Sequence, residues 1–285
     1  MKKLVDFLFE NLTKLTALFS LIILVAIMVV LFKEAYPAME EFGFSFIVED
    51  KWAPNREIFG GFSSIVGSLL STFIAMVIAT PIAIGIAIFL SEIAPKQIKE
   101  PIGVSVELLA AIPSVIYGMW GLFYFAPIIR DIFGGNGIGM LTAGIVLAIM
   151  ILPFIAAITR DAMNTTPDML KESAYALGAT KWDVIKDVII PFAKAGVIGS
   201  VILALGRAIG ETMAVTFVMG NVHKISFDLT AASTNIPTTL ANEFAEAESG
   251  LHYSSLFFLA FILFMMSFLT IFIAKIYFFR KIRNS

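Results

Sequence analysis

The chain has 285 residues, of which 59% are hydrophobic and only 15% are charged, and its mean hydropathy is +0.91. Because about 25% of the residues in an average soluble domain are charged, this composition excludes an ordinary soluble protein and predicts a polytopic membrane protein. The net charge of −2, without a basic block, gives no support to nucleic-acid binding, and a chain without cysteine has no disulfide framework or thiolate metal site.

Six long apolar runs follow one another along the chain. About 20 apolar helical residues cross the hydrocarbon layer of a bilayer. Residues 2–14 are expected to form a short amphipathic entry rather than a cleaved signal, because Asp6 and Glu10 interrupt them. We predict six transmembrane helices, over residues 15–32, 58–91, 108–129, 132–159, 195–222 and 253–274.

Lysine and arginine are distributed unevenly between the two sides that six spans define. Arg207 lies inside a span, and five of the other 19 basic residues flank one side: Lys33, Lys51, Arg56, Arg130 and Lys224. The remaining 14 flank the opposite side: Lys2, Lys3, Lys14, Lys96, Lys99, Arg160, Lys171, Lys181, Lys186, Lys194, Lys275, Arg280, Lys281 and Arg283. By the positive-inside rule, both termini and the 160–194 loop are expected to be cytoplasmic.

The outer loops, about 33–62 and 220–252, contain more acidic than basic residues. The second loop holds both histidines, His223 and His252. Two separated histidines without a neighbouring cysteine do not make a metal site, so we expect each to be solvated or packed and no metal to be bound.

The third span contains candidate polar groups. Ser114 and Tyr117 follow Pro113 on one helix face and could offer hydroxyls to an oxyanion, although ordinary packing explains them equally well. Glu107 begins this span, where a carboxylate suits a helix N-terminus, and a structural role is expected for it.

The loop before the fifth span reads RDAMNTTPDMLKESAYALGATKWDVIKDVIIPF over residues 160–192. Thr166, Pro167 and Asp168 are typical of a helix start, with Thr166 as the capping hydroxyl. Gly178 suits the left-handed residue that ends a helix. A second short helix is expected from Lys181 to Pro191.

The fifth span carries two opposite charges, Arg207 and Glu211, in the run GRAIGETMAV. An ionised group inside a bilayer is costly, so both side chains should face protein or water. Four residues apart on a helix, they share one face and could form an ion pair that only braces the bundle. The alternative is that Arg207 meets a transported anion, since guanidinium matches oxyanions with two parallel hydrogen bonds, and that Glu211 tunes it.

The loop resembles the EAA loop of ABC-importer permeases. It has Glu172-Ser173-Ala174, Gly178 after three further residues, and Val188-Ile189-Ile190-Pro191 nine residues later, against the pattern E-A-A-x3-G-x9-I-x-L-P. The departures at Ser173, Val188 and Ile190 are mild. The resemblance implies that residues 166–191 form a coupling loop, in which Glu172, Ser173, Ala174 and Gly178 contact a separate ATPase subunit.

Together with the segments AIPSVIYG, ALGATKW and GRAIGETMAV, this pattern resembles PstC-type permeases of phosphate ABC importers. The resemblance implies an all-α, MetI-like ABC importer permease fold, with an N-terminal helix and outer loop over 1–62 and the permease core over 63–279. It also implies four partners: a PstA-type permease in a heterodimer, a PstB-type ATPase dimer, an extracytoplasmic phosphate-binding protein, and phosphate itself. The location implied is the plasma (inner) membrane of a prokaryote.

No phosphate-binding loop of the form G-x-x-x-x-G-K-[ST] occurs in the chain. ATP and Mg are therefore expected in the partner ATPase, with no cofactor and no catalytic residue in this chain. The alternatives are a permease for another oxyanion, sulfate or molybdate, and a proton-coupled secondary transporter that uses Glu107 and Glu211. An intramembrane enzyme is disfavoured because no predicted span contains His or Cys.

Overall fold

The computed structural model describes residues 2–226, 228–247 and 250–283, and their regular structure is almost entirely helical. The long helices are α1 (Lys2–Phe42), α3 (Phe62–Ile88), α7 (Met140–Asn164), α10 (Ile190–Ile209) and α13 (Leu251–Arg283). Shorter helices are α2 (Ser45–Val48), α4 (Lys96–Ala110), α5 (Ser114–Trp120), α6 (Ala126–Phe133), α8 (Asp168–Ala176), α9 (Lys181–Val184), α11 (Met213–Met219) and α12 (Ile236–Glu243). Three π-helical turns, η2 (Phe89–Ile93), η3 (Gly121–Phe125) and η4 (Ile185–Ile189), prolong or join them, and a small hairpin of β1 (Trp52–Ala53) and β2 (Ile58–Phe59) encloses the 3₁₀ turn η1 (Pro54–Arg56).

Five helical segments of the described chain are long and apolar enough to cross a membrane, with a sixth if one bent pair counts as a single span. The five are 6–42, 62–93, 140–164, 181–209 and 251–277. The bent pair is 96–110 with 114–133, which meet at an angle of 90°. The six-span prediction therefore holds in number when the bent pair is counted once.

The core forms where α3 packs along α7. Helix α3 buries Ala75, Ala79, Ala83 and Ala87, which recur every fourth residue and therefore lie on one face. Such small side chains let two helix backbones approach closely, as is typical of helices that pack within a bilayer. Helices α10 and α11 close the core around buried side chains of α7.

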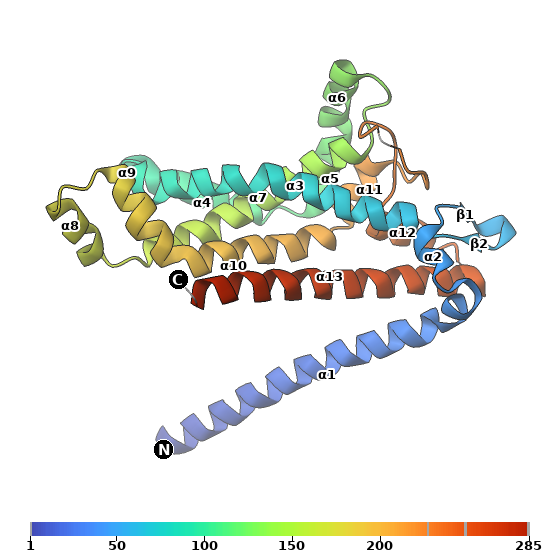
Figure 1. Cartoon of the computed structure of the whole chain (residues 1–285), viewed down its shortest axis with the longest axis horizontal. Helices are drawn as coiled ribbons and strands as arrows, with labels where there is room; N and C mark the ends of the chain where they lie inside the picture. The colour runs from blue at the N-terminus through green and yellow to red at the C-terminus, as the bar shows by residue number, and fades with distance from the viewer. Residues whose placement is uncertain (1, 227, 248–249, 284–285) are drawn as a thin grey trace.

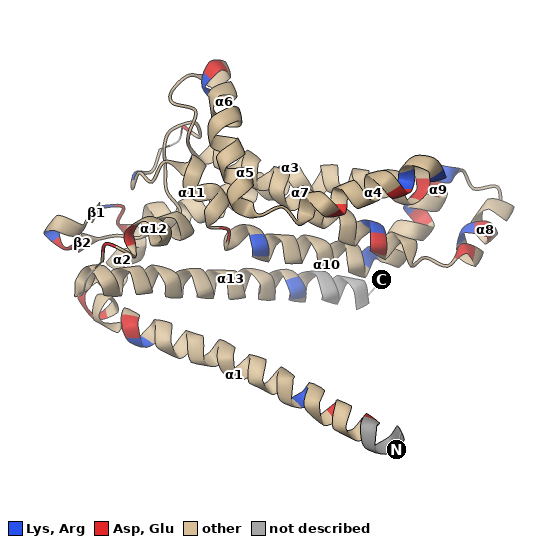
Figure 2. Cartoon of the chain, turned by 180° about the vertical axis from the view of Figure 1, so that it is seen from behind, with Lys and Arg blue, Asp and Glu red and all other residues tan. Residues whose placement is uncertain are grey.

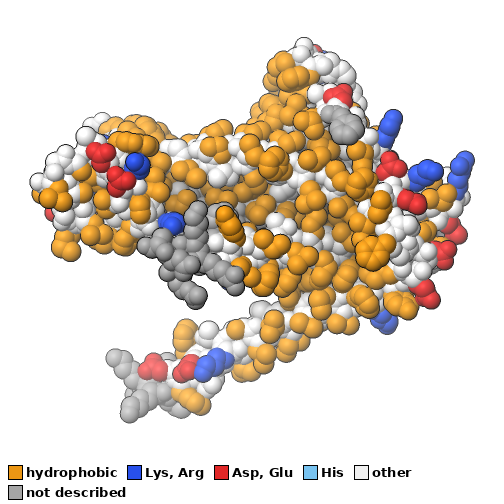
Figure 3. Space-filling model, viewed as in Figure 1, with side chains coloured by type: hydrophobic (Ala, Val, Ile, Leu, Met, Phe, Trp, Pro, Cys, Tyr) orange, Lys and Arg blue, Asp and Glu red, His pale blue; other side chains and the backbone are white. Residues whose placement is uncertain are grey.

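Helix α1 stands apart from this core. None of its most apolar 18-residue window is buried, and Figure 1 shows the helix leaning away from the bundle, beside α13 only near the outer end. The ring of Phe32 meets that of Phe261 at 5.7 Å between centroids. Figure 3 shows hydrophobic side chains along the visible face of α1. A helix this apolar and this exposed is suited to lipid or to another membrane subunit.

The two ends of the bundle differ in what they carry. Both chain ends, α8 and α9 lie at one end, and the β-hairpin, α2 and α12 lie at the other (Figure 1). Figure 2 shows that charged residues gather toward both ends and are sparse between them. Termini at the same end agree with an even number of crossings.

The third and fifth predicted spans are each interrupted by a break in the helix. The third breaks at residues 111–113, because Pro113 has no N–H to donate and disfavours helical conformation in the residue before it. The fourth then begins at Met140 rather than near residue 132. The fifth breaks between Ile209 and Met213.

Two helix ends also differ from their predictions. Helix α1 continues past residue 32 to Phe42, with Pro37 inside it. The second helix of the loop does not stop at Pro191 but runs on through η4 into α10. Pro191 is accommodated because the wider π-turn comes before it and because it lies in the first turn of α10, where an N–H is not needed.

Candidate functional site

Arg207 lies in the last turn of α10, just before the helix breaks. Its side chain is exposed, and its guanidinium carbon lies 5.8 Å from the centroid of the Phe154 ring on α7, in a cation–π contact. No carboxylate of the described residues forms an ion pair with Arg207. Its positive charge therefore faces outward from the chain without neutralisation by a partner acid.

The sequence predicted Glu211 one helical turn beyond Arg207 on the same helix, and the structure differs. Glu211 lies in the break, where its Oε1 accepts a hydrogen bond of 3.2 Å from the backbone N–H of Ala214. The carboxylate thus caps the N-terminus of α11, where a negative charge is favourable. The prediction of a self-neutralising intrahelical pair is wrong, because Gly210 ends α10 before Glu211 is reached.

Tyr117 and Ser114 lie on α5, next to this break. Tyr117 is buried, and its hydroxyl donates to the carbonyl oxygen of Leu109 at 2.8 Å, which bridges the bend between α4 and α5. Ser114 begins α5 and is half-buried.

Gly118 allows α5 to cross α11 at close range. A Cβ at this position would lie 2.9 Å from the carbonyl oxygen of Ala214 and 3.0 Å from its Cα. This contact places Tyr117, the neighbour of Gly118, beside the start of α11, where the N–H of Ala214 binds Glu211. Tyr117 also lines an apolar pocket of about 260 Å³, together with Ile112, Ile116, Trp120 and Ile149.

The chemistry of this region suits an anion. An exposed guanidinium can donate to two oxygens of one ligand, and the neighbouring phenol is already committed to a backbone carbonyl. The region is open on the side of Arg207, so a second protein surface is needed to enclose a ligand there.

Glu107 has the structural role that was expected, in a different place. It lies near the end of α4 rather than at the start of a span, and it forms an ion pair with Arg160 of α7. Arg160 also binds Asp161 at 2.8 Å. The arginine therefore ties α4 to α7.

Helix α8 contains the predicted contact residues of the loop. Glu172 and Ser173 are exposed, and Ala174 is half-buried against a cluster formed by α9 and η4. Gly178 has φ +87°, which is the left-handed conformation predicted for it. The predicted capping by Thr166 is wrong: Pro167 occupies the N-cap position, and the Thr166 hydroxyl is buried without a partner among the described residues.

Large apolar side chains around α8 face solvent, which the sequence analysis missed. Leu177 is 90% exposed and Met169 is 71% exposed, with Tyr175 and Trp182 beside them. Apolar side chains gathered at the polar end of a bundle mark an interaction surface. The sequence does place these large apolar residues within an otherwise polar loop, and this pattern could have indicated an interaction surface.

The end of the bundle that holds the hairpin and α12 carries a second cluster that was missed. Glu243 of α12 accepts hydrogen bonds from Trp52 Nε1 at 2.6 Å, His223 Nε2 at 3.0 Å and His252 Nε2 at 3.1 Å. Trp52 stacks on His223, and Phe59 stacks on His252. The histidines are packed, as predicted, but around one carboxylate that joins three distant parts of the chain.

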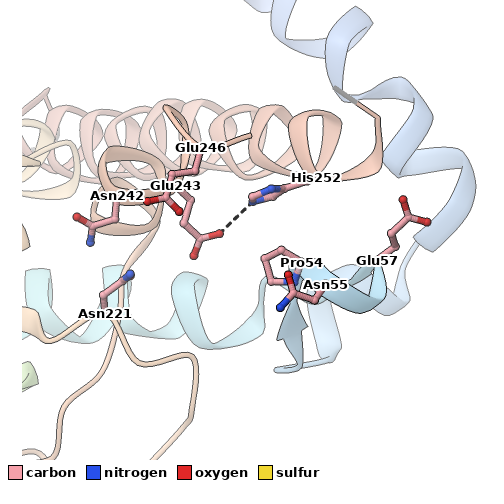
Figure 4. A pocket seen from close by; sticks show the side chains of 8 residues that line it. All are labelled: Pro54, Asn55, Glu57, Asn221, Asn242, Glu243, Glu246 and His252. Atoms are coloured by element: carbon pink, nitrogen blue, oxygen red, sulfur yellow. Dashed lines mark hydrogen bonds and ion pairs between the residues drawn. The ribbon is translucent and has the colours of Figure 1, made fainter. Parts of the chain in front are cut away.

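A polar pocket of about 820 Å³ adjoins this cluster (Figure 4). The figure shows side chains from the hairpin region, from α12 and from the start of α13 around it, with the bond between Glu243 and His252 dashed. Burial disfavours the charged form of Glu243, yet the hydrogen bonds from His223, Trp52 and His252 hold the pKa of this carboxyl below its usual value. Within the described residues no group of three His, Cys, Asp or Glu is arranged to hold a metal ion.

The helical bundle with broken spans, a loop helix at one end and a polar cap at the other defines a transport subunit of the membrane. The chain belongs to the family of binding-protein-dependent transport system inner membrane components, which matches residues 58–283. It is 47% identical to the phosphate transport system permease protein PstC of Mesorhizobium japonicum, over 95% of this chain and 89% of that protein. It is 45% identical to PstC of Pasteurella multocida, over 96% and 91%.

Solved structures agree on the fold. A bacterial alginate ABC transporter, in complex with a periplasmic protein bound to an alginate pentasaccharide, contains a chain that matches with a TM-score of 0.65 at 17% identity. The match covers 94% of this chain and 93% of that one. The MetNI methionine ABC transporter matches with a TM-score of 0.57 at 18% identity, over 78% and 93%. The MetI-like permease fold predicted from the sequence is thus confirmed.

Proposed function

We propose that this chain is the permease subunit of an ATP-driven inorganic phosphate importer and that it forms the translocation pathway with a paralogous permease. The observation that carries the proposal is the identity of 45–47% with proteins named phosphate transport system permease PstC, over nearly the whole chain. The open, positively charged face at Arg207 supports a pathway that a second permease completes.

The partners follow from the two ends of the bundle. Helix α8 presents Glu172, Ser173 and exposed apolar side chains, which suits docking to an ATPase dimer of PstB type that binds ATP and Mg. The outer end, with its acidic polar pocket, suits an extracytoplasmic phosphate-binding protein. The termini, which lie at the α8 end, are cytoplasmic in this proposal.

Arg207 is proposed to bind phosphate during passage, and Glu211 to set the geometry of the break beside it. By binding the N–H of Ala214, Glu211 stabilises the start of α11 and so the break that follows Arg207. Phosphate carries a proton at neutral pH and sulfate does not, so a carboxylate nearby also favours phosphate over sulfate. Ser114 and Tyr117 line the same side, with Tyr117 holding the bend rather than the ligand.

The test is phosphate uptake into vesicles that hold this chain with a PstA-type permease, the ATPase and the binding protein. We expect uptake that needs ATP and that sulfate and molybdate do not inhibit. Arg207→Gln should lower uptake at least about tenfold, equivalent to about 1.4 kcal/mol, while the complex still assembles. Arg207→Lys should recover only part of it, because lysine cannot donate in a planar fork.

Three results would contradict the proposal or its assignment of Arg207. Uptake inhibited by sulfate or molybdate would assign another oxyanion. Uptake that persists without the ATPase, driven by a proton gradient, would assign a secondary transporter. Loss of assembly in Arg207→Gln would show that this arginine braces the bundle.

A further inference from the structure

A partly buried ion pair connects α8 to the end of α3. Lys171 Nζ of α8 lies 3.0 Å from Glu92 Oε1 of η2, and the two side chains are 18% and 11% exposed. In this pair both side chains are largely shielded, whereas Glu107 and Asp161, the carboxylates that pair with Arg160, are 52% and 66% exposed. Removing two charges from water is costly, so the pair is poorly explained as a contribution to stability alone.

Glu92 is held in place by its surroundings. The hydroxyl of Ser91 donates to Glu92 Oε1 at 2.9 Å, and Lys99 of α4 donates to the carbonyl oxygen of Ser91, also at 2.9 Å. Cations at this point suit the negative end of the α3 helix dipole. Lys171 therefore pairs with a carboxylate whose position is fixed by contacts from both α3 and α4.

The rest of α8 is attached lightly. Its inward contact is Ala174, which packs against the cluster that includes Val184, Ile185 and Ile189 of α9 and η4. Met169 and Tyr175 face solvent. The pair with Glu92 is thus the polar link from α8 to α3, and unlike the apolar contact it is directional.

Helix α3 connects this end of the bundle to the other. It packs along α7 through the buried alanines at 75, 79, 83 and 87. At its outer end, the hydroxyl of Ser68 accepts a hydrogen bond of 2.9 Å from the backbone N–H of Ile236, the first residue of α12. Movement of α3 along its axis would therefore also displace α12.

We propose that Glu92 and Lys171 are positioning residues for energy coupling: they hold α8 on α3, so that displacement of α8 by the ATPase displaces α3 with it. This inference rests on the proposed function of α8 as the ATPase contact. The pair stays closed through the transport cycle and acts as a rigid connection, not as a switch that opens.

The first test compares transport with ATP hydrolysis in proteoliposomes that hold the whole complex. We expect Glu92→Gln and Lys171→Gln to co-purify with the ATPase and to keep basal hydrolysis within about twofold. Phosphate transported per ATP should fall at least about fivefold in both. Lys14→Gln removes an exposed lysine that pairs with Glu10 on α1, and it should leave the ratio unchanged.

The second test uses the absence of cysteine from the chain. The double variant Glu92→Cys with Lys171→Cys, in a complex whose other chains lack reactive cysteine, should transport as poorly as the single variants. A short bifunctional thiol reagent that joins the two positions should restore transport to at least half of the wild-type rate. The single-cysteine variants, treated with the same reagent, should stay uncoupled.

The outcomes separate the two proposals. No phosphate transport by the wild-type complex contradicts the proposed function. Normal transport by the wild type with an unchanged ratio in the Gln variants overturns the coupling role. A cross-linked protein that remains inactive also overturns it, because α8 would then have to leave α3. Loss of the ATPase from Lys171→Gln alone would make Lys171 a docking residue and likewise overturn it.

Discussion

Glu243 organises the end of the molecule that holds the hairpin and α12, because one carboxylate satisfies donors from three separate segments. Trp52 comes from the hairpin, His223 from the loop after α11, and His252 from the start of α13. Hydrogen bonds to an ionised acceptor are stronger than neutral ones, and removing the acceptor leaves buried donors unpaired. A single side chain therefore fixes how these segments meet.

We expect Glu243→Gln to destabilise the protein by about 1–3 kcal/mol at neutral pH. The folded-state pKa of Glu243 lies below its usual value, so its contribution is present above the unfolded-state pKa and is lost as the pH falls through the folded-state pKa. The difference in melting temperature between wild type and Glu243→Gln should therefore be large at pH 7 and shrink below about pH 4.

Thermal unfolding in detergent between pH 3.5 and pH 7 measures this difference. Glu246→Gln, on the rim of the same pocket, serves as the control and should follow the wild type. An equal decrease in melting temperature for Glu243→Gln at both pH values would show that the stabilisation does not depend on the charge of the carboxylate.

At the scale of elements, the breaks in the helices determine where the candidate site residues lie. The break at 210–212 exposes Arg207 at the end of α10 and turns Glu211 into a cap, and the bend at 111–113 places Tyr117 across from them. Irregular backbone at membrane depth is tolerated where it is buried in protein or lines a cavity. Both irregularities lie on the side that we propose as the pathway.

The corner between α8 and α9 gives a test at this scale. Gly178 has φ +87°, so Gly178→Val should strain the corner by about 1–2 kcal/mol and turn α8 away from its present direction. Affinity for the ATPase should fall about 5- to 30-fold, as measured by titration of the ATPase onto the permease in nanodiscs. Gly199→Ala, in open space on α10, should bind as the wild type does, and equal binding by both variants would show that the corner does not orient α8.

The whole molecule is a bundle with different surfaces at its two ends and an apolar flank between them. Both chain ends and α8 share one end, while the hairpin and α12 form the other (Figure 1). The most apolar 18-residue window of α1 contains no buried residue in the described chain, which leaves this part of the helix free to contact lipid or another subunit. The molecule therefore leaves surfaces that are suited to contact with lipid or with other subunits.

Cysteine labelling tests the orientation of this bundle. In a chain without cysteine, Arg56→Cys should react with a membrane-impermeant maleimide in intact spheroplasts, and Lys181→Cys should not. In inside-out vesicles the pattern should reverse, because the basic flanks hold the α8 end in the cytoplasm. Labelling of both positions from the same side would contradict the proposed topology.

The sequence by itself determined the class of protein, the number of crossings, the left-handed Gly178 and the family. Apolar runs of membrane length, proline and glycine act through local physics, so they can be read from a single chain. The sequence also indicated Arg207 as a charge that must face protein or water.

Only the tertiary structure decided how these residues meet. The spacing of Arg207 and Glu211 predicted an ion pair on a continuous helix, but packing of α5 against α11 at Gly118 accompanies a break that separates them. The cluster at Glu243 joins residues as far apart as 52 and 243, and the pair of Glu92 with Lys171 joins two helices that are distant in the chain. Contacts of this kind depend on which helices pack together, and local sequence patterns do not predict that packing.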